Sequence, residues 1–445
     1  MDTQMRNIII AVVVTAIVVG GVVFGAMVLF QPAPAETDFL KIYHWWTSGG
    51  EKAAVDALVK VFTDKYPNVT VEQTPVTGGA GFAMLSVIKT LVLAGQAPDA
   101  FQMHAGYEGV PYFDAGLLDT IDALWTDEGL TAVIPQVVQD MCKFDGHFYA
   151  VPVNIHRANV IWYNKDVLDT AGIDPSTLTT WTAFFDACDA IEAHGSLTIT
   201  NAISMGQTWT AAHAFEQILA SRGIDVYEKW INGDITSSTD TDLVGALETF
   251  EEYMGHVNPD HATLTWDDAT KKVLNGEAAF NIMGDWANGE FFVAEQEYGV
   301  DYGTIPVPGT GDMYGLVIDC FQHPKNVEHP TNSLRWLGVV GSKAGQDAFN
   351  PIKGSISART DADTTKYGDY QQAAMADFAD ISESANKYMF PSVVHGSGAP
   401  ESFKVKLSDI MSAFVTNLNV ATAASAIAQA ALDYAAEFTV VWSLD

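Results

Sequence analysis

The fold is decided by residues 39–75, which read FLKIYHWWTSGGEKAAVDALVKVFTDKYPNVTVEQTP. Residues 39–44 alternate apolar and polar side chains, which is the period of a β-strand. Residues 51–66 then place apolar side chains on one helical face, and Pro67 ends that helix. A second short strand follows at residues 69–71. The order strand, helix, strand predicts parallel strands joined by a helical crossover, as in an α/β fold.

The same alternation continues along the chain. A glycine-rich turn leads into another helix and strand, and a second unit begins near residues 149–153. In sheets of this kind, ligands lie in the loops beyond the carboxyl ends of the strands. We expect further helices at 82–91, 181–194, 211–221, 240–253, 331–349 and 420–438, and further strands at 100–103, 300–307 and 315–319.

Length and charge limit the possible functions. A chain of 445 residues suits two domains of about 150–200 residues each. Its 55 acidic residues against 22 lysines and arginines give a net charge of −33, which would repel nucleic acid. Because the acids are spread along the chain, the charge indicates a solvated acidic surface, with a cation or ligand site as the alternative.

The N-terminal region reads as a membrane anchor or signal with a spacer, over residues 1–36. Residues 8–30 carry no charge and are long enough to cross a hydrocarbon core of ~30 Å. A secretory signal core is shorter, at about 7–15 residues, so we expect an uncleaved tether. The small residues at 33–35 leave cleavage as the alternative. Both interpretations place the rest of the chain outside the cytoplasm, at the cell surface or in a periplasm.

Catalytic and metal-binding motifs are absent from the sequence. It contains no HExxH, no GxSxG elbow and no phosphate loop, and its histidines are scattered. The three cysteines Cys142, Cys188 and Cys320 have no zinc spacing and allow at most one disulfide, with buried thiols as the alternative. We therefore predict no catalytic residues, no metal and no cofactor. A hydrolase built on paired carboxylates remains an alternative, since no pair stands out among so many acids.

The glycine-rich segment Gly78-Gly79-Ala80-Gly81 lacks the lysine of a phosphate loop and the spacing of a dinucleotide-binding motif. It predicts instead a tight turn whose backbone approaches another group closely.

Aromatic side chains stand beside hydrogen-bonding groups in several loop-like positions. Trp45-Trp46 ends the first strand, and Asp285-Trp286 follows the apolar run at 278–283. Sugars are bound in this way, by stacking on aromatic rings and by fixed polar groups that pair with the hydroxyls. Core packing is the alternative for a single tryptophan. Two adjacent tryptophans cannot both face the core, which favours carbohydrate binding.

Several longer motifs strengthen this interpretation. They are residues 77–81, PDAFQMHAG (98–106), VPVNIHRANVIWYNK (151–165), AAFNIMGDWANG (278–289), GSKAGQDAFNPIKGSISAR (341–359) and VHGSGAPESF (394–403). With Trp45-Trp46, they make residues 38–440 resemble the family 1 extracellular solute-binding proteins of ABC importers, the maltose-binding-protein-like class. Within that class the chain looks most similar to the glucose-, galactose- and mannose-binding branch.

The resemblance implies a two-lobed α/β fold of the periplasmic-binding-protein type II, with an interlobe hinge and a ligand cleft. Lobe 1 would comprise residues 37–150 and 304–353, and lobe 2 residues 151–303 and 354–445. The implied protein is a non-catalytic receptor that closes on a monosaccharide and delivers it to ABC permease subunits in the membrane. It would bind no nucleic acid and act as a monomer. A disaccharide or oligosaccharide receptor is the alternative.

The resemblance also implies a set of ligand-binding residues. These are Trp45, Trp46, Glu51, Gln102, His104, Asn154, Trp209, Trp230, Asp285, Lys353 and His395. The tryptophans would stack on the sugar, Asp285 and Glu51 would accept hydrogen bonds from hydroxyls, and Lys353 and His395 would donate them.

Other roles remain open for three of these residues. His104 could be a histidine buried in the core, Asn154 could form hydrogen bonds with the backbone of the hinge, and Trp230 could pack in the core.

The chain also departs from its bacterial relatives, which usually carry a cleaved signal or a lipidated cysteine. Its N-terminal hydrophobic segment without such a cysteine suits a cell with a single membrane.

Overall fold

The computed structural model describes residues 38–438. The predicted anchor and spacer lie outside the described residues. Within residues 38–438, no helix combines the length and the hydropathy needed to cross a bilayer.

A five-stranded sheet confirms the predicted crossover. Its strands are ordered β2-β1-β3-β12-β6, and they comprise β1 (Phe39–His44), β2 (Thr70–Pro75), β3 (Ala100–His104), β6 (Ala150–Pro152) and β12 (Asp319–Gln322). β1 runs parallel to both β2 and β3. β12 runs antiparallel to β3 and β6. The carboxyl ends of β1, β2 and β3 therefore open onto one edge of the sheet.

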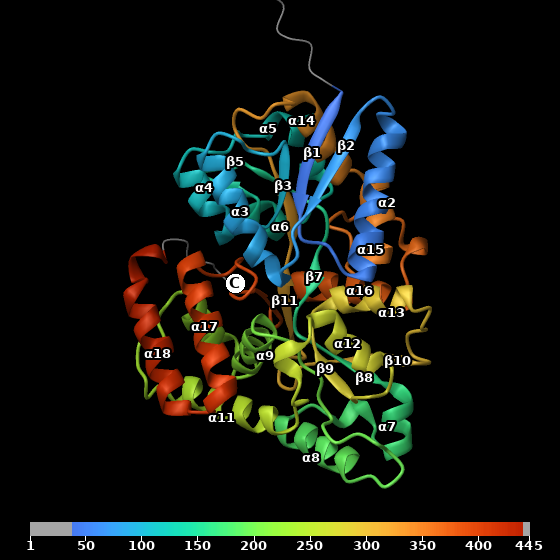
Figure 1. Cartoon of the computed structure of the whole chain (residues 1–445), viewed down its shortest axis with the longest axis vertical. Helices are drawn as coiled ribbons and strands as arrows, with labels where there is room; N and C mark the ends of the chain where they lie inside the picture. Colours follow the sequence, from blue (N-terminus) through green and yellow to red (C-terminus); the bar gives the residue numbers. More distant parts are fainter. Residues whose placement is uncertain (1–37, 439–445) are drawn as a thin grey trace, which may run out of the picture. The chain divides into compact units, whose positions relative to one another are not determined.

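Helix α2 (Gly49–Lys65) makes the first crossover, and its start and end follow from the sequence. The Ser48 side chain caps it by accepting a hydrogen bond from the backbone N–H of Glu51. Ala54, Leu58 and Phe62 lie on its buried face. α2 packs against α15 (Lys343–Lys353), beside which it lies in Figure 1. The first turn of α2 therefore lies close to the edge where β1 ends.

Two three-stranded sheets accompany the five-stranded one. One has the order β10-β8-β9 and the other β13-β11-β7. Their strands are β7 (His156–Arg157), β8 (Val160–Asn164), β9 (Phe280–Ile282), β10 (Tyr302–Pro306), β11 (Met313–Val317) and β13 (Tyr388–Pro391). Figure 1 shows β8, β9 and β10 in the lower part of the view, the five-stranded sheet in the upper part, and β7 and β11 between them.

Helices surround these sheets. On the side of the five-stranded sheet they are α3 (Phe82–Leu93), α4 (Val110–Asp114), α5 (Asp122–Asp127), α6 (Gln136–Met141), α14 (Pro330–Val340) and α15, with a small hairpin of β4 (Lys143–Phe144) and β5 (His147–Phe148). Elsewhere they are α7 (Lys165–Ala171), α8 (Trp181–Glu192), α9 (Trp209–Ala220), α10 (Ile224–Ile231), α11 (Thr241–Gly255), α12 (Trp266–Leu274), α13 (Asn288–Val293), α16 (Asp369–Glu383), α17 (Glu401–Asn417) and α18 (Val420–Asp433).

The segment 331–349 is helical as predicted, but the helix is interrupted. The segment contains two helices, α14 and α15, which are separated at Gly341 and Ser342. The Ser342 hydroxyl accepts a hydrogen bond from the backbone N–H of Gly345, 3.0 Å away, and so starts a new helix. The predicted strand at 315–319 likewise divides, because β11 ends at Val317 and β12 begins at Asp319 in a different sheet.

Two clusters of buried apolar side chains form the core. One surrounds the five-stranded sheet and includes Leu40 and Trp336, and the other includes Phe184 and Phe250. The predicted lobe boundaries remain a proposal. In the structure β10 pairs with β8, so the chain returns to the five-stranded sheet at β12.

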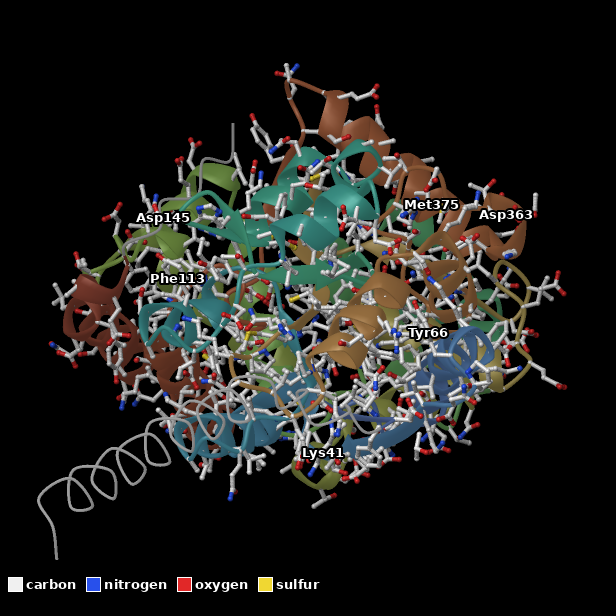
Figure 2. The ribbon with its side chains drawn as sticks, turned by 90° about the horizontal axis from the view of Figure 1, so that it is seen from above. Lys41, Tyr66, Phe113, Asp145, Asp363 and Met375 are labelled. Carbon is white, nitrogen blue, oxygen red and sulfur yellow. The ribbon has the colours of Figure 1, made fainter. Side chains whose placement is uncertain are left out.

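The acidic side chains lie mainly at the surface. Asp145 and Asp363 lie on opposite sides of the molecule in Figure 2, and Asp145 is exposed. Eight acids among residues 38–438 are buried, namely Glu51, Asp99, Glu108, Glu216, Asp285, Glu290, Asp319 and Asp347. Burying a carboxylate is costly unless it is paired. The surroundings of these eight therefore show where charge has a structural or functional role.

Candidate functional site

A cavity of about 290 Å³ lies at the carboxyl ends of β1, β2 and β3. Its size is near the lower end of the range of small-molecule sites, roughly 300–1,000 Å³. Segments far apart in the sequence line it. They supply Trp45, Trp46, Thr47, Ser48, Glu51, Thr77, Gly78, Gly79, Ala80, His104, His156, Gln207, Trp209, Thr265, Trp266, Asp267, Asp268, Trp286, Val317, Asp319, Lys353 and His395.

The tryptophan pair after β1 forms one wall. The Trp45 ring lies 4.8 Å from the ring of His104, which ends β3. The Trp46 ring packs 4.7 Å from the ring of Phe349, and its indole N–H has no hydrogen-bond partner among the described residues. Buried indole N–H groups normally find an acceptor. In this structure the N–H is buried rather than open to the cavity.

Three further rings form a second part of the lining. The ring of His395 lies 4.9 Å from that of Trp286 and 5.7 Å from that of Trp209. Trp209 begins α9, and Trp286 lies in the short 3₁₀ turn that follows β9. The His395 ring also lies 5.6 Å from that of His104, so the second group of rings adjoins the first.

The glycine-rich turn brings the two walls close together. A Cβ atom placed on Gly79 would lie 2.1 Å from the indole nitrogen of Trp209. No side chain fits at that distance, so this position requires glycine while the walls stay in contact. The prediction that the backbone approaches another group here is confirmed.

An ion pair spans the wall between α2 and α15. The Lys353 ammonium lies 3.1 Å from a carboxylate oxygen of Glu51, and both side chains are buried. The other oxygen of Glu51 accepts a hydrogen bond from the backbone N–H of Thr47. Burial raises the pKa of Glu51, and the charge of Lys353 offsets this rise only in part.

The floor is organised around Asp319, the first residue of β12. One of its oxygens accepts a hydrogen bond from the Gln102 side chain at 2.9 Å. The other accepts from Asn154 at 2.8 Å and from His156 at 3.2 Å. Gln102 also accepts from the backbone N–H of Trp45 at 3.0 Å. These contacts fix the floor and tie it to the tryptophan wall.

Asp285 lies behind this floor and is fully buried. One of its carboxylate oxygens hydrogen bonds to Nδ1 of His156, and the other accepts from the backbone N–H of Arg157 at 3.0 Å. Burial lowers the pKa of His156, but the charge of Asp285 and the hydrogen bonds to Asp285 and Asp319 together outweigh that effect, and the net shift is upward. The two carboxylates therefore favour the protonated form of His156.

A second buried chain of ionisable groups runs from His104. Its Nδ1 lies 3.1 Å from Glu108, which also pairs with Lys404 of α17, and its Nε2 lies 3.9 Å from Asp319. Burial raises the pKa of Glu108, but the charges of Lys404 and His104 outweigh it and lower the pKa to about 2. His395 differs, because burial and then the neighbouring histidine His213 lower its pKa well below the ordinary value. A neutral His395 can donate a hydrogen bond from one ring nitrogen and accept one at the other.

The structure brings most of the predicted site residues together. Seven of them line the cavity, and these are Trp45, Trp46, Glu51, His104, Trp209, Lys353 and His395. Gln102, Asn154 and Asp285 lie behind the wall and hold residues that form it. Both oxygens of Asp285 are engaged inside the protein, which differs from the expected direct contact with a hydroxyl.

Trp230 lies elsewhere. It packs in the apolar core, with its ring 5.2 Å from Phe403 and 6.1 Å from Phe215. Its exposed fraction is 1%, and it does not line the cavity. α10 is amphipathic and turns this residue inward, so the packing alternative describes its position.

Other residues of the lining are outside the predicted ligand set, among them Asp319, His156 and Trp286, although the sequence analysis notes the pair Asp285-Trp286. Asp319 is an acid inside the apolar run 315–321, GLVIDCF, and a charge in such a run is a signal of burial with a partner. His156 lies in the motif NIHR, and Trp286 adjoins Asp285. Their motifs are recognisable, but the side chains that reach the cavity depend on the fold.

Comparisons with known proteins agree on one group. The family model described as bacterial extracellular solute-binding protein matches residues 46–347. The uncharacterized ABC transporter extracellular-binding protein of Pyrococcus horikoshii is 45% identical over 392 residues, covering 88% of this chain and 87% of that protein. The xylose/arabinose-binding protein XacG of Haloferax volcanii is 29% identical, covering 80% of this chain and 76% of that protein.

A solved structure shows the same fold. The bacterial solute receptor AcbH, described as having an exclusive substrate preference for β-D-galactopyranose, superposes with a TM-score of 0.74. The match covers 89% of this chain and 98% of that chain, at 19% sequence identity. The predicted α/β fold of the periplasmic-binding-protein type is therefore confirmed.

Proposed function

The chain belongs to the bacterial extracellular solute-binding protein family, and we propose that it is the sugar-binding component of an ABC importer. The family binds solutes and does not catalyse reactions. We further propose that the captured solute is a monosaccharide of the glucose, galactose or mannose type.

One observation carries this proposal most strongly. A cavity of about 290 Å³ is lined by several tryptophans and by hydrogen-bonding groups. Aromatic faces stack on the apolar C–H faces of a sugar, and fixed polar groups read its hydroxyls. The polar groups are held by buried partners, as Gln102 and Asn154 hold Asp319. Groups that are already held in place lose little freedom on binding.

The small volume favours a monosaccharide over an oligosaccharide. The relative from Haloferax volcanii, named for the pentoses xylose and arabinose, gives further support for a small sugar. We propose Trp45, Trp209 and Trp286 as stacking residues. Glu51, Asp319, Lys353 and His395 would pair with the hydroxyls, and Asp285 would act through His156 rather than touch the sugar.

We propose that closure of two lobes couples binding to transport. The cavity is lined both by the loops of the five-stranded sheet and by α9, α12 and the loop after β13. A sugar that contacts both sides favours the closed arrangement by its differential affinity. The closed protein would then dock on the membrane permease, as a monomer, with energy supplied by separate ATPase subunits.

The experiment is a thermal-shift and calorimetry panel on the full chain with glucose, galactose, mannose, xylose and maltose. A ligand at 100 times its Kd stabilises the native state by about 2.7 kcal/mol. We expect a clear rise in Tm with at least one hexose. A response to maltose alone would support the oligosaccharide alternative, and any product recovered after incubation would support a hydrolase.

We also propose that residues 8–30 tether the protein to the outer face of the membrane. N-terminal sequencing of the protein isolated from its native membranes tests this. A mature protein that begins near Ala35 would show that the segment is cleaved.

A further inference from the structure

A second group of side chains lies beside the cavity. One member, His395, belongs to the proposed sugar site, but the proposed function gives the group as a whole no role. His213 and Glu216 are three residues apart on α9, which places them on the same face of the helix. His395 comes from the loop after β13. One potential ligand atom from each of these three side chains lies within 4.8 Å of the other two, and all three side chains are buried.

The two histidines have nitrogen atoms without partners. Among the described residues, both ring nitrogens of His213 and Nε2 of His395 lack a hydrogen-bond partner. His213 is completely buried, and His395 is 2% exposed. Unpaired buried polar atoms are rare in native proteins and indicate a missing partner.

Glu216 is a buried carboxylate that has hydrogen-bond donors around it but no cationic partner among the described residues. It is completely buried, and among residues 38–438 it forms no ion pair with a lysine or arginine. Its oxygens accept hydrogen bonds from neutral groups, namely the Tyr227 hydroxyl, the Ser392 hydroxyl, the Gln217 side-chain amide and the backbone N–H groups of Val393 and Val394. Buried carboxylates are as a rule paired with a cation or bound to a metal.

We propose that His213, Glu216 and His395 bind a divalent transition-metal ion such as Zn²⁺ at the wall of the cavity. Two imidazoles and one carboxylate are a ligand set that Zn²⁺ accepts, with a fourth position left for water. In such a tetrahedral site, two ligands at ~2.1 Å from the ion lie about 3.4 Å apart. The ligand atoms, which lie within 4.8 Å of one another, therefore need to approach each other by up to about 1.4 Å.

The surroundings orient these ligands. The Ser392 hydroxyl lies 2.7 Å from Glu216 and 2.8 Å from Nδ1 of His395. Because Nδ1 of His395 is engaged, Nε2 is the atom that can bind the ion. Metal-binding histidines usually have their second nitrogen held in this way.

A bound ion would be linked to the ligand of the cavity, because His395 lines that cavity. If His395 pairs with a sugar hydroxyl, as proposed above, metal and sugar compete for it. The linkage is reciprocal, so each must weaken the other by the same factor. This second statement rests on the proposed function, whereas the metal site does not.

The test is a calorimetric titration of the chelator-treated full chain with Zn²⁺. We expect one ion per chain, and binding at least about 10-fold weaker in His213→Asn and in His395→Gln, as is usual when a metal site loses one of its supporting groups. His256→Gln is the matched control. His256 belongs to the more exposed group Asp189, Glu192 and His256, whose His256–Glu192 distance is 3.1 Å. Absence of binding, or binding lost only in His256→Gln, would overturn the proposal.

A measurement on the unmodified chain guards against variants that do not fold. Paramagnetic Co²⁺ in the site should shift the NMR resonances of two imidazole rings, and shifts on none or on the His256 ring alone would contradict the assignment. Separate titrations, with the sugars of the panel in the absence of Zn²⁺ and with Zn²⁺ in the absence of sugar, distinguish the two proposals. Zn²⁺ binding with no sugar binding by the metal-free protein would support the metal site and contradict the transport function, whereas sugar binding with no Zn²⁺ binding would contradict the metal site alone.

Discussion

The ammonium nitrogen of Lys353 lies 3.1 Å from a carboxylate oxygen of Glu51, and this buried pair joins α15 to the first turn of α2. Removing one member of such a pair leaves a charge in a poorly solvated place. We expect Lys353→Met to reduce the free energy of unfolding by about 3–5 kcal/mol. Guanidinium unfolding measures the change. The double variant Lys353→Met with Glu51→Gln should lose less free energy of unfolding than the two single variants lose together. Simple additivity would show that the two residues are not coupled.

Gly79 offers a test of closure. Its replacement by alanine puts a Cβ against Trp209, so the walls cannot approach as they do here. We expect Gly79→Ala to weaken sugar binding by about 1–3 kcal/mol in calorimetry, which is the usual cost of overpacking. Gly311→Ala is the control, because a Cβ there meets nothing within 4 Å. Equal affinities in the two variants would mean that closure does not depend on this contact.

Substitutions of Trp209 and Trp230 can distinguish a role in sugar binding from a role in core packing. Trp209 lines the cavity and Trp230 lies in the core. Trp209→Ala should therefore lower sugar affinity with a smaller effect on stability. Trp230→Phe should lower the free energy of unfolding by about 1–3 kcal/mol and leave the Kd of the folded protein unchanged. A loss of sugar affinity in Trp230→Phe would show instead that Trp230 contributes to sugar binding.

Asp285 is expected to act through His156. Asp285→Asn removes the charge that raises the pKa of His156, so that pKa should fall, as NMR titration of the ring will show. We expect sugar affinity to fall by about 1–3 kcal/mol, since the orienting partner of a site residue is lost. Asp377→Asn is the control, because Asp377 pairs with Arg157 at the surface. An unchanged His156 pKa in Asp285→Asn would contradict this role.

Stability in acid depends on Glu108. Its pKa is about 2 in the native state, against an ordinary value of 4.5. The native state therefore holds this group ionised, and the stability it contributes is present above about pH 4.5. As the pH falls toward 2, the unfolded chain takes up the proton first, and the free energy of unfolding should drop by up to about 1.4 kcal/mol per pH unit. Urea unfolding at several pH values measures the slope.

The Glu108→Gln variant should flatten that slope. Glu401→Gln serves as its control, because Glu401 forms a surface ion pair with Lys89. If both variants keep the slope of the unmodified chain, another group is responsible for the acid sensitivity.

The sequence predicts the secondary structure well where periodicity alone decides it. The strand and helix at 39–66 are recognisable because their apolar residues face one core. The break between α14 and α15 is not predicted, since a serine cap inside an apolar pattern gives little local signal. The position of Trp230 escapes prediction for a related reason. A motif shows which residue types are present, whereas the side of the helix that faces the cavity depends on long-range packing.

The site is predictable in part. Lys353 and His395 come from motifs that lie far along the chain from Trp45, and at the level of sequence it is the family resemblance that connects the three. Asp319 and His156 are different, because their role depends on how β12 and β7 pair with their neighbouring strands. Such pairing is a property of the sheet rather than of the local sequence.

The buried side chains from Lys404 through Glu108, His104, Asp319 and His156 to Asp285 alternate between basic and acidic types and come from six different segments. Anyone who redesigns this receptor for another ligand, for example as a biosensor, must therefore treat the series as one unit. A single neutral replacement leaves an odd charge inside the protein, so libraries should exchange these positions in complementary pairs. The tryptophans carry no such constraint and are the safer positions at which to begin.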